Sequence, residues 1–291
     1  MNRVKEIICA KHVYESGYTG KNVTVALLDT GVDVFHPDLK DKVICFQDYV
    51  NKRQPCYDDN GHGTHIAGII CGMGTNSMGK YAGLAPGAKI SAMKVLDRYG
   101  NGSTENVLNA LEFIRNNAKK YNVRILNFSI GYLPGAGNRE QERLIHMLEE
   151  LWDMGIVVVT AAGNNGPGEN TVTVPGISRK LLTVGSMDDQ KNSYSGKGPT
   201  TCCIVKPEIL APGTDIISTK NDHKGYFSKT GTSMAAPIVC GACALLIERK
   251  PEITPEEIKV YLYDSVTPLK KEDHRKSWGI LNVDQLIQSA I

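Results

Sequence analysis

Short apolar runs alternate with longer segments of helical periodicity along most of this chain. The runs are rich in Val, Ile and Leu, as buried parallel strands are. They lie at residues 21–28, 88–96, 123–129 and 156–160, with shorter ones at 181–184 and 215–218. Helices are predicted at residues 66–71, 103–120, 139–154, 232–248 and from 254 onward. This alternation predicts an α/β fold with a doubly wound, mostly parallel sheet flanked by helices.

No composition shift, linker or repeat divides the chain, so we predict a single domain over residues 1–291. The net charge is +2 without a long single-sign run, which gives no reason to expect a nucleic-acid or membrane partner. We expect no segment with the length and apolarity of a membrane span. The first ten residues do not resemble a signal peptide, so the expected location is the cytoplasm. A chain trimmed of its leader would look the same.

The cysteines are scattered along the chain and do not form the framework of a small secreted protein. Cys202 and Cys203 are adjacent, and Cys240 and Cys243 lie one helical turn apart in an apolar segment. No second Cys pair or nearby His pair makes a zinc site. We therefore expect free thiols in a reducing compartment and no metal centre.

Polar residues stand where the predicted strands end, and ligands bind at that edge of an open parallel sheet. Asp29 closes the first apolar run, and Asn164 follows the run at 156–160. Each also suits a turn. The segments 100–102 and 129–131 follow two other strands. None of these features identifies a site when it is considered alone.

Ser233 and His62 each stand at the start of a predicted helix. A serine there can attack a carbonyl while backbone N–H groups of the first turn face the developing oxyanion. Alternatively, Thr232 or Ser233 is only the helix cap. His62 lies between two glycines, whereas His65 falls inside the apolar helix and is expected to be a core histidine. The His-x-x-His spacing lacks the glutamate of a zinc-protease helix, so we reject a metal interpretation.

Together, these residues supply an acid, a base, a nucleophile and a neutral amide donor. Asp29, His62 and Ser233 occur in the order Asp, His, Ser, which is one of the known orders of the catalytic Ser-His-Asp constellation. The combination favours nucleophilic catalysis over helix capping at Ser233.

Three blocks of this sequence resemble the signature blocks of the subtilisin-like serine proteases. They are residues 29–33, 60–68 and 231–237, in the family's order. Shorter matches lie at 36–39, 83–86, 161–164 and 210–213, so the resemblance runs from about Gly17 to the C-terminal helix. Segments 79–86 and 206–213 look most similar to bacterial intracellular subtilases.

The resemblance implies a serine endopeptidase that works through an acyl-enzyme on Ser233. His62 would take and return the proton, and Asp29 would fix the imidazole. The Asn164 side chain and the Ser233 N–H would form the oxyanion hole. The same motifs leave open a narrow processing protease for one partner. A catalytically silent binding scaffold is a further alternative, although such proteins commonly lose a catalytic residue.

The resemblance also implies how a peptide or protein substrate binds. An extended peptide would lie between two edge segments and place one side chain in a pocket with no charged residue. We therefore predict a preference for large apolar or aromatic residues before the scissile bond. The residues implied are Gly100, Asn101 and Gly102 on one edge, Ser129, Ile130 and Gly131 on the other, and Ala161, Ala162 and Gly163 with 173–176 in the pocket.

Catalysis by such a site needs no cofactor. Asp38 matches an aspartate that binds structural calcium in many relatives, but the loop 74–79 does not clearly keep the calcium-binding pattern, and a plain turn fits it equally. The family blocks begin almost at once. We therefore expect no separate propeptide in this sequence, either because it was removed or because the protein folds without one.

Overall fold

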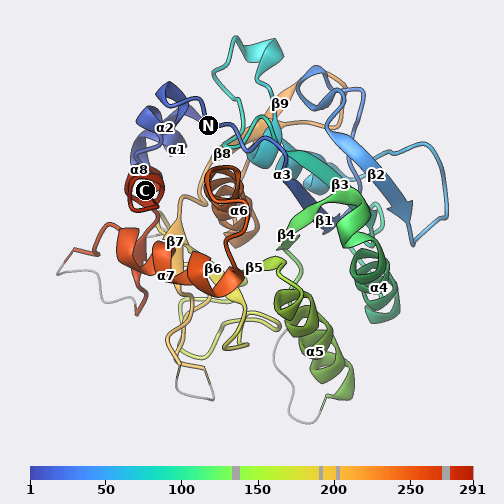
Figure 1. Ribbon diagram of the computed structural model, residues 1–291. Helices are drawn as coiled ribbons and strands as arrows, with labels where there is room; N and C mark the ends of the chain where they lie inside the picture. Colours follow the sequence, from blue (N-terminus) through green and yellow to red (C-terminus); the bar gives the residue numbers. More distant parts are fainter. Residues whose placement is uncertain (133–137, 190–192, 201–203, 271–275, 291) are drawn as a thin grey trace.

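The computed structural model describes residues 1–132, 138–189, 193–200, 204–270 and 276–290. Its centre is a sheet of eight strands (Figure 1). In chain order these are β1 (Thr24–Asp29), β2 (Val43–Asp48), β3 (Lys89–Lys94), β4 (Val123–Phe128), β5 (Val157–Ala161), β6 (Leu182–Ser186), β7 (Ile209–Ala211) and β10 (Gly279–Ile280).

All neighbouring strands of this sheet run parallel, in the order β10-β7-β6-β5-β4-β1-β3-β2. The order reverses around β1, which lies between β4 and β3. Most strands are buried along their length, in keeping with their continuous apolar sequences. The predicted α/β fold with a doubly wound parallel sheet is confirmed.

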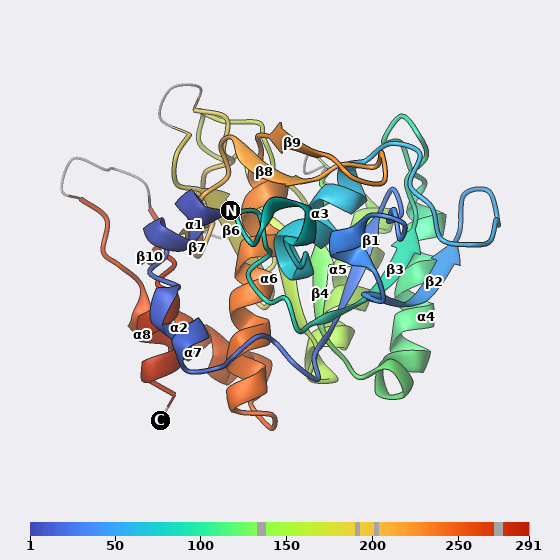
Figure 2. The same ribbon diagram turned by 90° about the horizontal axis from the view of Figure 1, so that it is seen from above.

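Helices cover both faces of the sheet (Figures 1 and 2). On one face lie α3 (His62–Cys71) and α6 (Thr232–Arg249), and on the other lie α4 (Thr104–Tyr121) and α5 (Arg139–Asp153). At the side of the molecule lie α1 (Asn2–Ile7), α2 (Lys11–Glu15), α7 (Pro255–Ser265) and α8 (Val283–Gln288).

The helix boundaries follow from the caps. Ser103 Oγ accepts the N–H of Asn106 at 3.1 Å and starts α4, and Thr254 forms a capping box with Glu257 at α7. Within the described residues, α6 is the one helix long and apolar enough to cross a membrane, so the expectation that no segment has these properties is wrong. However, 83% of it is buried inside the protein, as a central core helix would be.

The structure corrects three details of the predicted fold. The run at 215–218 corresponds to β8 (Ile216–Thr219), which pairs antiparallel with β9 (Tyr226–Lys229) in a separate two-stranded sheet. The region after Asp29 contains strand β2, where no strand is predicted because prolines flank this part of the sequence. Helix α3 extends beyond the apolar run 66–71 and begins at His62, in agreement with the placement of His62 at a helix start.

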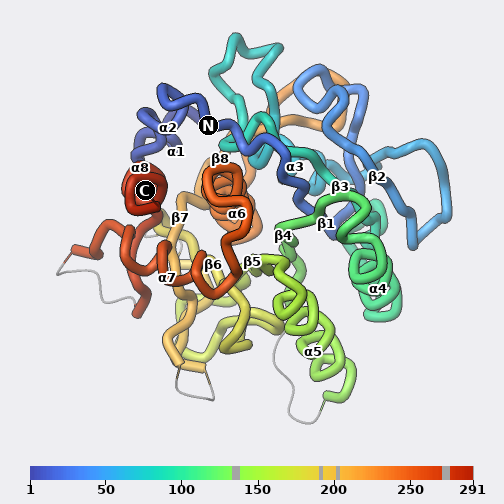
Figure 3. Tube along the Cα trace, in the orientation of Figure 1, coloured from blue at the N-terminus to red at the C-terminus, as the bar shows by residue number. Residues whose placement is uncertain are grey.

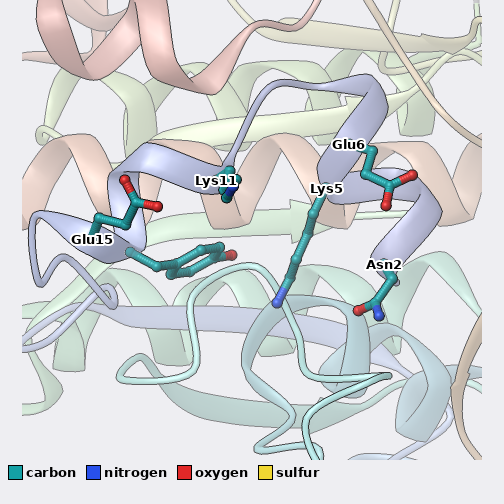
Figure 4. Close-up of a pocket in the computed structure, with 6 residues that line it drawn as sticks. Asn2, Lys5, Glu6, Lys11 and Glu15 are labelled. Carbon is teal, nitrogen blue, oxygen red and sulfur yellow. The ribbon is translucent and has the colours of Figure 1, made fainter.

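The N-terminal and C-terminal segments meet where α2 packs against α8 (Figure 3). A hollow of about 390 Å³ is lined only by residues of the N-terminal segment (Figure 4). Because none of the predicted site residues lines it, this hollow is separate from the candidate site.

The described cysteines are free thiols, and all except Cys9 are buried. Burial raises the pKa of Cys71 and of Cys243 to about 12, which keeps both in the unreactive thiol form. Cys202 and Cys203 lie outside the described residues.

Candidate active site

Asp29 and His62 form a buried hydrogen-bonded pair at the carboxyl end of β1. Asp29 ends the strand, and its carboxylate also accepts the N–H of Thr30 at 2.8 Å. His62 begins α3, and its Nδ1 lies 2.8 Å from Asp29 Oδ1 and 2.9 Å from Oδ2. The aspartate side chain is 1% exposed and the histidine side chain 24% exposed. Nδ1 therefore carries the proton that faces the carboxylate, and Nε2 remains free to accept one.

Glycines allow this close approach of α3 to β1. A Cβ atom on Gly63 would lie 2.2 Å from the carbonyl oxygen of Gly31 and 3.1 Å from Asp29 Cβ. Gly61 caps the helix with φ of 102°, a conformation that other residues seldom adopt. Gly63 is thus required by the close contact with Gly31 and Asp29, and Gly61 by its left-handed backbone conformation.

The surroundings of His62 leave its pKa above the ordinary value. Burial lowers the pKa of His62, but the charge of Asp29 and its hydrogen bond raise it by more. Lys229 lowers the pKa and Asp58 raises it, both by smaller amounts. Since a general base has to be neutral, His62 can accept a proton only at pH values above this raised pKa.

Ser233 stands in the first turn of α6, two residues after the cap Gly231. Its Oγ donates to the carbonyl oxygen of Ser129 at 3.3 Å. The hydrogen bonds of the described residues do not include one between Ser233 Oγ and His62. Catalytic hydrogen bonds are often long in free enzymes and shorten with substrate bound. Proton transfer to His62 therefore requires the Ser233 hydroxyl to turn away from Ser129.

Asn164 is held beside Ser233 by the residue that precedes the serine. Its Oδ1 accepts the backbone N–H of Thr232 at 3.0 Å and the Thr232 hydroxyl at 3.1 Å. Thr232 is fully buried, and its Oγ1 also accepts the N–H of Gly163 at 3.1 Å. With Oδ1 engaged in this way, Nδ2 is the atom of Asn164 that is left to donate to an oxyanion.

A hollow of about 230 Å³ opens beside Ser233 and Asn164. Five of the predicted substrate-binding residues line it, namely Ser129, Gly131, Ala161, Gly163 and Thr173. Asn165 and Thr232 line it too. Every residue of this lining is uncharged. The hollow lies beside the predicted nucleophile, and its exposed lining is mainly polar.

The other predicted substrate-binding residues lie outside this hollow. Ala162 is fully buried, and Ile130 packs against the core. The segment 100–102 forms an exposed turn after β3, in which Gly102 bridges to Leu96. The substrate-binding roles of Ile130, Ala162 and Gly100–Gly102 stay predictions.

Comparison with known proteins decides the family. The family described as the subtilase family matches residues 20–279. The chain is 40% identical to serine protease AprX of Bacillus subtilis, in an alignment that covers 91% of this chain and 66% of AprX. It is 32% identical to subtilisin DY of Bacillus licheniformis, with 97% of each chain covered. The chain belongs to the subtilase family. It is a serine endopeptidase, as the resemblance implied.

The solved structures agree with the fold of this subtilase. The CspB protease of Clostridium perfringens superposes with a TM-score of 0.87 over 99% of this chain and 97% of the other, at 19% sequence identity. At that level of identity the similarity concerns the fold alone. The parallel sheet and its helices are therefore those of a subtilisin-like protease.

Sequence reasoning missed the support that Thr232 gives to Asn164. The sequence suggests only a capping role for Thr232, yet Gly231 is the cap and the Thr232 hydroxyl points to Asn164 and Gly163. It also missed the carbonyl of Ser129 as the acceptor for Ser233 Oγ. A buried threonine next to a predicted nucleophile was the one available signal.

Thr232→Val should test whether Thr232 positions the oxyanion donor. Valine keeps the shape and the backbone N–H but loses the hydroxyl that contacts Asn164 and Gly163. We expect kcat to fall by about three- to tenfold, the effect of one neutral hydrogen bond, with little change in KM. Steady-state kinetics on a peptide substrate measures both constants.

Combining Thr232→Val with Asn164→Ala tests whether Thr232 acts by positioning Asn164 or only supports the local structure. Asn164→Ala itself should lower kcat by about 10²–10³-fold, the range measured for the corresponding donor in subtilisin. Adding Thr232→Val to it should then have no further effect, because the group that Thr232 holds is gone. Thr230→Val, a neighbouring and exposed position, is the matched control. Additive losses from Thr232→Val and Asn164→Ala would contradict the positioning role.

Proposed function

We propose that this subtilase cleaves peptide bonds through an acyl-enzyme formed on Ser233. The observation that carries the proposal is the 2.8 Å contact between His62 Nδ1 and Asp29, at the sheet edge where α6 presents Ser233. Ser233 Oγ attacks the carbonyl carbon and passes its proton to His62 Nε2. The C–N bond then breaks as His62 protonates the leaving amine. Water attacks the acyl ester in a second, similar cycle.

The proposed oxyanion hole has two donors. One is Nδ2 of Asn164, whose Oδ1 is held by Thr232. The other is the backbone N–H of Ser233, which belongs to the first turn of α6 and has no partner four residues earlier in the helix. The positive end of the helix macrodipole supports negative charge at this point. Asp29 acts through His62, and it stabilises the imidazolium that forms while the proton is held there.

The breadth of cleavage distinguishes a general endopeptidase from a narrow processing protease. We propose cleavage after large apolar or aromatic residues, because the hollow beside Ser233 has no charged lining. Digestion of unfolded casein together with a proteome-derived peptide library tests both points. Many cleavages after apolar residues would support the proposal, and cleavage of a single site would favour the processing protease. Equal cleavage after Lys or Glu would overturn the predicted pocket preference.

The remaining parts of the proposal concern the whole chain. A single peptidase domain over residues 1–291 is supported by one hydrophobic core that includes residues from Met1 to Ala290. The near-neutral charge and free buried thiols support a cytoplasmic protein that acts on peptides rather than on nucleic acid or membranes. The catalytically silent binding scaffold is set aside, because the chain belongs to a family of serine endopeptidases.

Asp38 does not fit a calcium site well. Its carboxylate is fully buried, and its oxygens accept the N–H of Asn76 at 3.3 Å and the hydroxyl of Tyr226 at 2.9 Å. In the part of the chain that the structure describes, no group of three His, Cys, Asp or Glu side chains could hold a metal ion. We therefore expect EDTA to leave the Tm of the Ser233→Ala protein unchanged in thermal denaturation. A lower Tm, restored by added calcium, would contradict this.

A further inference from the structure

Lys229 of β9 lies near enough to His62 for its charge to act on the imidazole, and it takes no part in the chemistry proposed above. We propose that Lys229 selects substrates with an acidic residue in the first two positions after the scissile bond. This inference rests on the proposed function and adds a specificity on the leaving-group side.

The β8–β9 hairpin directs Lys229 toward the first turns of α3. Lys229 is the last residue of β9 and pairs with Ile216 of β8. Alternate residues of a strand share one face, so Lys229 and Phe227 point to the same side. The Phe227 ring packs edge-on against His65, with 4.9 Å between ring centroids, and Lys229 Nζ lies 5.1 Å from the Phe227 centroid.

His65 and His62 are three residues apart on α3 and so lie on one face of that helix. The Lys229 ammonium therefore lies by the Phe227 ring, and that ring lies against His65, one helical turn from His62. Burial is the main cause of the lowered pKa of His65, and the charge of Lys229 lowers it further; the same charge acts against the raised pKa of His62, which agrees with this placement. The cation is thus close enough to influence whatever lies against His62.

No carboxylate of the described residues forms an ion pair with Lys229. Asp29 is occupied by His62, and Asp58 accepts the N–H groups of Asn60 and Gly61 and both donors of Thr64. By contrast, Lys220 on the same hairpin pairs with Asp222 at 3.0 Å. Lys229 is half-buried, so its charge is available to a bound peptide and only partly screened by water.

The position of His62 decides which side of the scissile bond Lys229 faces. The hollow for the residue before the bond is lined from β4, β5 and α6, and neither His62 nor Lys229 lines it. His62 has to reach the leaving amine to protonate it. The peptide segment that leaves must therefore pass His62 and, beyond it, the ammonium of Lys229. A carboxylate in that segment would pair with Lys229, for which the described residues supply no acidic partner.

The test uses internally quenched peptides that differ only in the first or second residue after one scissile bond. Glu, Gln and Lys are compared at each position with the wild-type protein. We expect kcat/KM for the Glu peptide to exceed that for the Gln peptide by about three- to fivefold at low salt, and the Lys peptide to be the slowest. The preference should shrink at high salt because the pair is partly exposed.

Variants tie the preference to Lys229. In Lys229→Gln the three peptides should be cleaved at similar rates, and in Lys229→Glu the order should reverse in favour of Lys. The acid limb of kcat/KM on the Gln peptide should also move to higher pH in Lys229→Gln, because a charge that lowers the His62 pKa is lost. Asp29 and Asp58, the other groups acting on His62, are unchanged in these variants.

Lys224→Gln is the matched control, with the same charge change at an exposed position of the same hairpin, and it should keep the wild-type preference. Equal rates for Glu and Gln in the wild-type protein would overturn the inference, as would an unchanged preference in Lys229→Gln. Both of these results leave the proposed hydrolysis intact. Absence of hydrolysis of every peptide would overturn the proposed function and this inference with it.

Discussion

Ser233→Ala is expected to lower kcat by about 10⁶-fold, the size of the loss measured when subtilisin is deprived of its nucleophile. The residual rate would come from the oxyanion donors and from substrate binding, which the substitution leaves in place. Folding should not suffer, because the hydroxyl makes one hydrogen bond, to Ser129, at 3.3 Å. Peptide hydrolysis under single-turnover conditions gives the loss directly.

Ser228→Ala controls for the substitution itself. Ser228 is an exposed serine of β9, a few residues before Ser233. Its kcat should match that of the wild-type protein, and the thermal denaturation of both variants should show intact folds. A well-folded Ser233→Ala protein that keeps more than a small fraction of the wild-type rate would rule out Ser233 as the nucleophile.

Asp29→Asn is expected to lower kcat by about 10⁴-fold, a size known from another serine protease with the same triad. The amide can donate to Nδ1 of His62, which favours the tautomer with its proton on Nε2 and so blocks the base. The substitution should also shift the pH dependence of kcat/KM in a defined direction. Asp29 raises the pKa of His62, and activity is lost as the pH falls through that pKa. The acid limb of kcat/KM should therefore move to lower pH in Asp29→Asn.

A second pair in this protein provides the matched control. Asp33 is 3% exposed, and its carboxylate lies 2.8 Å from Nδ1 of His223. Asp33→Asn changes the same groups in the same way without touching His62. It should keep the wild-type pH profile and a rate within a few-fold. If both variants lost activity equally, or if the acid limb did not move in Asp29→Asn, Asp29 would have only a structural role.

Much of the fold could be predicted because its signals are local. The apolar runs that became β1, β4 and β5 are continuous, and the periodicity of α4 needs no knowledge of its neighbours. The pairing of β8 with β9 could not be predicted, since strand length and composition do not specify direction. Strand β2 could not be predicted either, because prolines near it are typical of loops.

The site residues, too, could be predicted from the sequence only where the signal is local. Asp29, His62, Asn164 and Ser233 could be identified because each stands at the end of an element and within a family block. The contact between Thr232 and Asn164 joins residues 68 positions apart, so no local pattern predicts it. The place of Lys229 depends on how the hairpin folds over α3, which the sequence does not specify.

The most direct measurement is the mass of the intact protein after reaction with a fluorophosphonate, which modifies an activated serine. We expect one adduct per chain, located on the peptide that contains Ser233, and a labelling rate that falls as the pH drops through the raised pKa of His62. Ser233→Ala should remain unmodified. A well-folded wild-type protein that takes up no adduct, or one modified at another serine, would contradict the account.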